Sequence, residues 1–347
     1  MAVVAELFDY VVGVDTHART HTFTVIHAKT GAVVDTASFP ASPSGMTRAI
    51  SWIDRRAQGR VFAAVEGTSS YGAQIAEALA AHGIPVGEVR PPSRNARALA
   101  GKSDAIDAEA AARSVVGQQI CRVAQPRATG TRAALRILLA SRSLLDQQRT
   151  ASRNALTALL RTIDLGVDVR KPLTDKQISS IAAWRITSRD PILTIARTEA
   201  RRLARAVIDI SSQLTNNLAL LRRHAEGMAP GLQDTPGIGP VTAAIIICAY
   251  SHHGRVRSEA AFAALGGIAP QPASSGNTTR HRLNRSGDRQ LNRAFDVIVR
   301  TRMSFDPDTR SYIQRRRAED KTNREIRRTL KRYVCRAVFR QLQILMA

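Results

Sequence analysis

The chain has few cysteines and few aromatic side chains. Its three cysteines, Cys121, Cys248 and Cys335, lie far apart and form no CxxC pair. This spacing argues against a zinc module and against a disulfide framework, and it fits a reducing cytoplasm. Phe, Trp and Tyr make up only 4% of the residues. Stacking of bases on aromatic rings is therefore not expected to dominate any binding of nucleic acid.

Long hydrophobic runs and a secretory signal are also lacking. No signal peptide precedes Val11, and no apolar run reaches the length of a membrane span. The sequence therefore predicts a cytoplasmic protein without a membrane partner.

Acidic residues are scarce outside the N-terminal third. The formal net charge is +23, from 51 Lys and Arg against 28 Asp and Glu. Residues 1–117 carry 11 basic and 11 acidic side chains, residues 118–275 carry 21 and 10, and residues 276–347 carry 19 and 7. Such a surplus suits a polyanion that is held through its phosphates, and a merely solvated surface does not require it. The 347 residues are enough for two or three domains.

The N-terminal third alternates predicted strands and helices. The expected strands cover residues 10–15, 22–28, 33–39, 61–66 and 85–89. The expected helices begin near Ser44, at Gly72 and at Asp104. Three strands, helix, strand, helix, strand, helix is the element order of the ribonuclease H-like fold, which predicts an α/β domain of this type.

Four carboxylates stand at the ends or starts of these elements. Asp15 and Glu66 each close an apolar strand, while Asp104 and Asp107 open a helix and share one of its faces. Carboxylates that converge on a sheet edge can hold two divalent ions, usually Mg²⁺, for in-line displacement at phosphorus. Taken singly, Asp104 could instead be a helix N-cap and Asp15 a turn residue. The four together favour a metal site.

A polar, basic loop covers residues 91–102. A loop beside the metal site would let Arg94 and Arg97 reach a phosphate. A plain connector explains the same composition equally well.

The middle of the chain, residues 131–162 and 189–226, is predicted to be helical. In the second segment a seam steps by four, three, four, four and three residues, through Leu203, Val207, Ile210, Leu214, Leu218 and Leu221. This spacing is typical of a coiled coil or a helical hairpin. An intramolecular helical bundle and a dimerisation arm both fit it.

The last third opens with Gly237-Ile-Gly239 ahead of an apolar helix at 241–249. Such a turn resembles the hairpin of a helix-hairpin-helix module, in which backbone N–H groups grip a phosphate. A tight turn into a buried helix fits the glycines as well.

A serine-rich loop follows at residues 270–276 and contains Ser274 and Ser275. Behind it comes a series of arginines, Arg280, Arg282, Arg285, Arg289 and Arg293. A serine facing arginines could attack a phosphodiester, with the arginines stabilising the charge that develops. Composition alone favours a solvated loop.

Six motifs in chain order carry a resemblance to a known family. They are VGVDTHARTH, AVEGTSSYG, KSDAIDAEAAAR, TPGIGPVTAA, FAALGGIAPQPASSG and NRSGDRQLNRAF. Together they resemble the DEDD insertion-sequence transposases of the IS110 family, which includes the Piv-type DNA invertases. The resemblance implies a RuvC-like domain at 1–118, a helical coiled-coil connector at 119–228 and a mainly α-helical C-terminal transposase domain with a catalytic serine at 229–347.

The resemblance also implies the roles of individual residues. Asp15, Glu66, Asp104 and Asp107 fall on the family's acidic tetrad, which binds Mg²⁺, and Ser275 falls on its nucleophile. The adjacent Ser274 is an alternative candidate for the nucleophile, and Ser286 is a weaker candidate. The implied activity is site-specific recombination of an insertion sequence through a covalent phosphoserine intermediate. The implied partners are donor and target DNA, a structured bridge RNA and further copies of the chain in a dimer or tetramer, in a bacterial cytoplasm.

Three positions depart from the family pattern. Arg19 stands where lysine is frequent, Asp288 where asparagine is frequent, and the segment 251–258 lacks a common Gly-Asp. None of these touches the tetrad or Ser275. The alternative function is a RuvC-like junction endonuclease that uses metal-activated water. A DNA- or RNA-binding protein without catalytic activity is a third hypothesis, and the intact tetrad argues against it.

Overall fold

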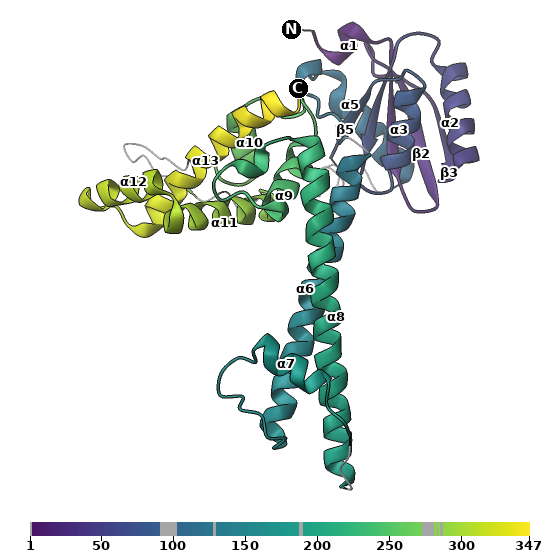
Figure 1. Cartoon of the computed structure of the whole chain (residues 1–347). Helices are drawn as coiled ribbons and strands as arrows, with labels where there is room; N and C mark the ends of the chain where they lie inside the picture. The colour runs from purple at the N-terminus through teal and green to yellow at the C-terminus, as the bar shows by residue number, and fades with distance from the viewer. Residues whose placement is uncertain are drawn as a thin grey trace. The chain divides into compact units, whose positions relative to one another are not determined.

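A computed structural model describes residues 2–90, 103–127, 130–186, 190–272, 281–282, 284 and 287–347. The chain forms two compact units, residues 1–127 and 128–347 (Figure 1). Each unit is described by itself below. The finer division into three domains at 118 and 228 stays a prediction. None of the helices in the described ranges combines the length and the apolar character that a bilayer crossing requires.

A five-stranded sheet forms the centre of the first unit. Its strands are β1 (Tyr10–Thr16), β2 (Thr20–His27), β3 (Val33–Pro40), β4 (Val61–Glu66) and β5 (Val86–Val89). They lie in the order β3-β2-β1-β4-β5, with β1, β2 and β3 antiparallel and with β4 parallel to both β1 and β5. The predicted mixed α/β domain is confirmed, and the observed strand limits differ from the predicted ones by at most two residues.

Helices cover both faces of this sheet because its central strands are apolar on both sides. On one face, α2 (Pro43–Arg56) and α3 (Ala73–Ala81) pack on alternate residues such as Val12 and Phe23. On the other face, α1 (Val4–Leu7) and α5 (Asp104–Val116) pack on Val11 and Ile26. The four-residue α1 was not predicted, because its length leaves no measurable helical period.

Gly13 allows α5 to lie directly on β1. A Cβ at this position would stand 1.9 Å from the carbonyl oxygen of Ala108 and 2.6 Å from the amide nitrogen of Ala112. No side chain fits between a strand and helix backbone at this distance. The approach brings the start of α5, which carries two of the predicted metal ligands, against the strand that carries Asp15.

Substituting Gly13 by alanine should therefore push α5 away from the sheet. We expect Gly13→Ala to lower the free energy of unfolding by about 1–3 kcal/mol, the usual cost of overpacking a rigid site. Urea denaturation of the full chain measures this. Gly117→Ala is the matched control, because Gly117 ends the same helix at a φ of −88° with no atom within 4 Å of the added Cβ. Equal midpoints for the two variants would show that the contact is loose.

The second unit begins with a long helical hairpin. Its antiparallel helices are α6 (Thr131–Thr162) and α8 (Pro191–Met228), and α7 (Asp175–Ala182) packs beside them. The predicted seam faces inward, since Leu203 and Val207 pack on Leu156 and Leu160 of α6. Packing within the chain thus accounts for the seam, and a dimerisation role stays a prediction.

The rest of the second unit is mainly helical around one apolar core. It contains α9 (Pro240–Tyr250), α10 (Glu259–Leu265), β6 (Gln271–Pro272), β7 (His281–Arg282), α11 (Arg289–Phe305), α12 (Pro307–Ala318) and α13 (Asn323–Leu345). Tyr250, Phe262 and Phe339 meet through their rings in the core. These three aromatic residues are therefore used for packing, whereas Phe305 and Tyr333 of the same unit are exposed.

Candidate functional site

Asp15 and Glu66 lie at the carboxyl ends of two neighbouring strands, on the same edge of the sheet. Strands β1 and β4 are parallel, with Val14 opposite Val65, so the next residue of each strand carries a carboxylate. The Thr16 hydroxyl donates to the carbonyl oxygen of Glu66 at 3.0 Å and ties the two strand ends together. Asp15 is buried and Glu66 is half-buried.

The helix α5 brings the other two carboxylates to this unit's sheet. The Ser103 hydroxyl accepts from the amide of Ile106 at 3.3 Å, so Ser103 is the N-cap. The alternative that Asp104 caps the helix is thus wrong. Asp104 and Asp107 occupy the first turn, where the positive end of the helix dipole stabilises carboxylates. Asp104 is exposed, and Asp107, one turn further, is buried against the sheet.

Among the described residues, three side chains could share one ion. One ligand atom each from Asp15, His17 and Asp104 lie within 4.8 Å of one another. His17 Nδ1 is 3.5 Å from Asp15 Oδ2. Glu66 and Asp107 lie outside this set of three. Glu66 is on the adjoining strand β4, and Asp107 is one turn further along α5 than Asp104. The structure thus brings two of the four predicted ligands together and adds a histidine.

The donor set fits a divalent cation. Carboxylate oxygens suit Mg²⁺ and Mn²⁺, and an imidazole nitrogen suits the later transition metals, so the three side chains together accept a wider range of ions than oxygen alone. Glu66 and Asp107 would add oxygen ligands if their side chains turned toward the ion. The three side chains could therefore hold a divalent metal, and two of them, His17 and Asp104, are exposed.

His17 is a candidate ligand that the sequence analysis missed. It follows Asp15 by two residues and lies one residue beyond the end of β1, where the alternation of a strand, if continued, places it on the same face as Asp15. The pattern Asp-Thr-His after an apolar strand therefore contained the signal. The predicted tetrad consists of carboxylates alone and therefore does not include this histidine.

A second histidine lies on the neighbouring strand. His21 pairs with Thr16 across the β1–β2 ladder and is buried. Burial lowers the pKa of His21, the nearby His17 lowers it further, and a hydrogen bond with the backbone of Thr20 opposes the shift. His21 is thus neutral near pH 7 and adds no positive charge beside the carboxylates.

The predicted Gly237-Ile-Gly239 turn is fixed by packing in the second unit. Gly237 has a φ of +82°, and a Cβ there would meet the carbonyl oxygen of Ile298 at 2.9 Å. Arg302 Nε donates to the carbonyl of Pro236 at 2.7 Å. Burial lowers the pKa of Arg302, and the charge of Asp306 counteracts part of that effect. These contacts account for Gly237 as a tight turn, and phosphate binding by the turn stays a prediction.

Several predicted site residues lie outside the described part of the chain. They are Arg94, Arg97, Ser274, Ser275, Arg280, Arg285 and Ser286. Of Arg282, only the backbone in β7 is described. The two remaining arginines, Arg289 and Arg293, are exposed on α11. Asp288, the departure from the family pattern, caps α11 by accepting from Gln290 and Leu291, a role that asparagine fills equally well.

Comparisons with known proteins match both ends of the chain. The DEDD transposase model of IS110, described as "Transposase", matches residues 12–164 and includes all four predicted tetrad positions. The model "Transposase IS116/IS110/IS902 family" matches residues 229–314 and includes Ser275. A Streptomyces coelicolor protein, "Insertion element IS110 uncharacterized 43.6 kDa protein", is 32% identical over 126 residues, which is 36% of this chain and 31% of that protein.

The α/β unit carries a cluster of possible metal ligands, and the helical unit that follows it in sequence is strongly basic. The two family models occur in order and together cover about two thirds of the residues. The chain belongs to the IS110 family of transposases.

Proposed function

We propose that this protein is a transposase that moves an insertion sequence by site-specific recombination. The observation that carries the proposal is the meeting of Asp15 and Asp104, from a strand and a helix far apart in sequence, in a chain of the IS110 family. The unit that carries them has the element order of a ribonuclease H-like fold, and we propose that it is RuvC-like. Its substrates are donor and target DNA, and a bridge RNA guides it to them.

The proposed chemistry divides the work between two groups of residues. The hydroxyl of Ser275 attacks a DNA phosphate, the phosphoryl group becomes bonded to Ser275 Oγ, and the DNA hydroxyl that leaves takes up a proton. Asp15, Glu66, Asp104 and Asp107, with His17, would hold Mg²⁺. A bound cation supplies positive charge that stabilises the phosphoryl oxygens. Attack of a DNA hydroxyl on the phosphoserine then restores the serine and joins new strands.

A junction endonuclease is the second candidate, and the carboxylate cluster itself favours it. Such a cluster is sufficient for cleavage by water activated on a metal ion, without any serine. The two functions differ in their products. Recombination leaves joined strands, because the bond energy of the broken phosphodiester is kept in the phosphoserine, while hydrolysis leaves free ends.

The test uses the full chain and the DNA that flanks its own gene. A plasmid carrying this flanking DNA is incubated with the protein, Mg²⁺, a target plasmid and RNA transcribed from the flanking region. We expect junctions between element and target, detected by sequencing across them, and we expect none when the RNA is left out. Two copies of the recombination site must be held together, so we also expect an oligomer on the DNA by sedimentation.

Other products would point elsewhere. Linear DNA with free ends and no junctions would support the endonuclease. Binding of DNA without any cut strand, in the presence of Mg²⁺ or Mn²⁺, would contradict both catalytic functions.

A further inference from the structure

The helix α13 carries a cationic face near its start. Arg324, Arg327, Arg328 and Lys331 are spaced by three, one and three residues, which places them on one side of the helix. Neighbouring like charges on a helix repel one another. A later set of arginines on the same helix, Arg332, Arg336 and Arg340, is balanced by Glu259, whose carboxylate lies 3.1–3.8 Å from them. On the first face, Asp296 pairs with Arg327 and Lys331 but not with Arg324 or Arg328.

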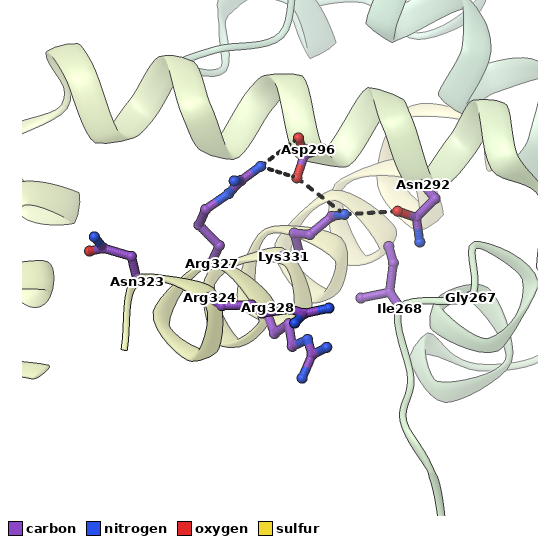
Figure 2. Close-up of a pocket in the computed structure, with 9 residues that line it drawn as sticks. All are labelled: Gly267, Ile268, Asn292, Asp296, Asn323, Arg324, Arg327, Arg328 and Lys331. Carbon is purple, nitrogen blue, oxygen red and sulfur yellow. Dashed lines mark hydrogen bonds and ion pairs between the residues drawn. The ribbon is translucent and has the colours of Figure 1, made fainter. Parts of the chain in front are cut away.

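These four cations line a cavity of about 690 Å³ between α11 and α13 (Figure 2). We call it the α11–α13 pocket; its other lining residues are Gly267, Ile268, Asn292, Asp296 and Asn323. Four basic side chains thus face a single carboxylate. A cavity with this surplus of positive charge attracts anions.

Two of the cations are held in place by hydrogen bonds. Asp296 accepts from Arg327 at 2.8 Å with both oxygens and lies 3.3 Å from Lys331. Burial alone would raise the pKa of Asp296, but Lys331 and Arg327 outweigh it and lower the pKa. Asp296 is therefore ionised near pH 7, and it fixes two long side chains at the wall of the pocket.

The other two cations are available for a ligand. Arg324 and Arg328 are exposed, and neither has a hydrogen bond or an ion pair with any residue in the described part of the chain. Figure 2 shows both guanidinium groups on the same side of α13. Guanidinium groups without an anionic partner bind phosphate oxygens through paired N–H donors.

The pocket borders the base of the serine loop. Lys331 Nζ donates to Asn292 Oδ1 at 2.8 Å, and Asn292 Nδ2 donates to the carbonyl of Gly266 at 2.7 Å. Gly266 and Gly267 form the turn that leads into β6, after which the chain continues to Ser275. The hydrogen-bonded series therefore joins the cationic face to the start of the segment that carries the predicted nucleophile.

We propose that the α11–α13 pocket binds backbone phosphates of the DNA strand beside the phosphate that is cut, with Arg324 and Arg328 as the direct contacts. Asp296 positions Arg327 and Lys331 behind them. This inference rests on the proposed function for the identity of the nucleic acid. Contact with phosphates alone makes the binding independent of base sequence.

The test measures the salt dependence of DNA binding by the full chain. A labelled DNA duplex and an RNA of the same sequence are titrated with wild type and with Arg324→Gln/Arg328→Gln. Each lost phosphate contact lowers the slope of log K against log salt by about 0.9 on duplex DNA. For the double variant we expect a slope that is less negative by about 2. Wild type should bind DNA more tightly than the variant at 50 mM salt, and the ratio of the two affinities should be roughly tenfold smaller at 200 mM salt.

A matched control removes two arginines from another part of the same unit. Arg222 and Arg223 on α8 are also exposed and without an ion pair among the described residues. Arg222→Gln/Arg223→Gln changes the net charge equally and should leave the slope within about 0.5 of wild type. Arg324→Lys/Arg328→Lys keeps the charge and should retain most of the slope. If the double glutamine variant fails to fold, the single variant Arg324→Gln replaces it, with an expected slope that is less steep by about 0.9.

The outcomes separate this inference from the proposed function. If wild type binds DNA and the pocket variant matches the control, the pocket inference is wrong and the proposed function stands. If the pocket variant loses affinity for RNA alone, the DNA assignment is wrong. If wild type binds neither polymer, both proposals fail.

Discussion

Replacing Ser275 by alanine is expected to abolish the covalent protein–DNA adduct and recombination with it. Removal of a nucleophile that forms a covalent intermediate lowers the rate by on the order of 10⁴–10⁶. The adduct is measured by denaturing electrophoresis of labelled DNA after incubation with the protein and Mg²⁺. Binding of DNA should be unchanged, because a single hydroxyl contributes little to a complex held by phosphate contacts.

The neighbouring serine provides the control for this expectation. Ser274→Ala should retain the adduct, since the resemblance assigns the nucleophile to the serine directly before glycine. Loss of the adduct in Ser274→Ala but not in Ser275→Ala would exchange the two roles. Cleavage at the wild-type rate when both serines are alanine would favour hydrolysis by water and the endonuclease function.

Replacing Asp15 by asparagine should remove metal binding at the sheet edge. The variant keeps the shape of the side chain but loses the charge that attracts a cation, at a position whose carboxylate lies within 4.8 Å of ligand atoms of both His17 and Asp104. We expect a loss of affinity for Mg²⁺ and Mn²⁺ of at least about 100-fold, by titration calorimetry, and a comparable or larger loss of strand cleavage.

Two further variants make the metal experiment specific. Glu77→Gln removes one carboxylate from the exposed side of α3 and should bind metal like wild type. His17→Gln should weaken Mn²⁺ more than Mg²⁺, because an imidazole ligand favours the transition metal. Metal binding by Asp15→Asn that equals wild type would contradict the role of this cluster.

The first unit could be predicted well because its signals are local. Apolar strands that end in Asp15 and Glu66, and a helix that opens at Asp104, define both the elements and the carboxylates without knowledge of the fold. The convergence follows from one fact that the order of elements implies, namely that β1 and β4 are parallel neighbours. Metal coordination by Glu66 and Asp107 depends on side-chain rotation, which neither the strand pattern nor the helix pattern determines.

The second unit was less predictable because its important contacts are tertiary. The sequence shows a surplus of basic residues after residue 275. A charge count cannot tell which basic residues of α13 pair with Glu259 and which line the α11–α13 pocket. That distinction depends on where α10 and α11 pack. Likewise, the glycines of the 237–239 turn gave no indication that Ile298 stands against the first of them.

The α6–α8 hairpin contains one buried amide with a mechanical consequence. Asn217 is 5% exposed, and its Nδ2 donates to the carbonyl oxygen of Leu138 at 2.9 Å. Sliding one helix past the other by half a turn, about 2.7 Å, would take the carbonyl of Leu138 out of reach and leave this amide buried without an acceptor. The hydrogen bond therefore fixes the register of the two helices, and with it the length of the hairpin. Its 38-residue α8 spans about 57 Å, and α7 is carried at a set distance from the α9–α13 core.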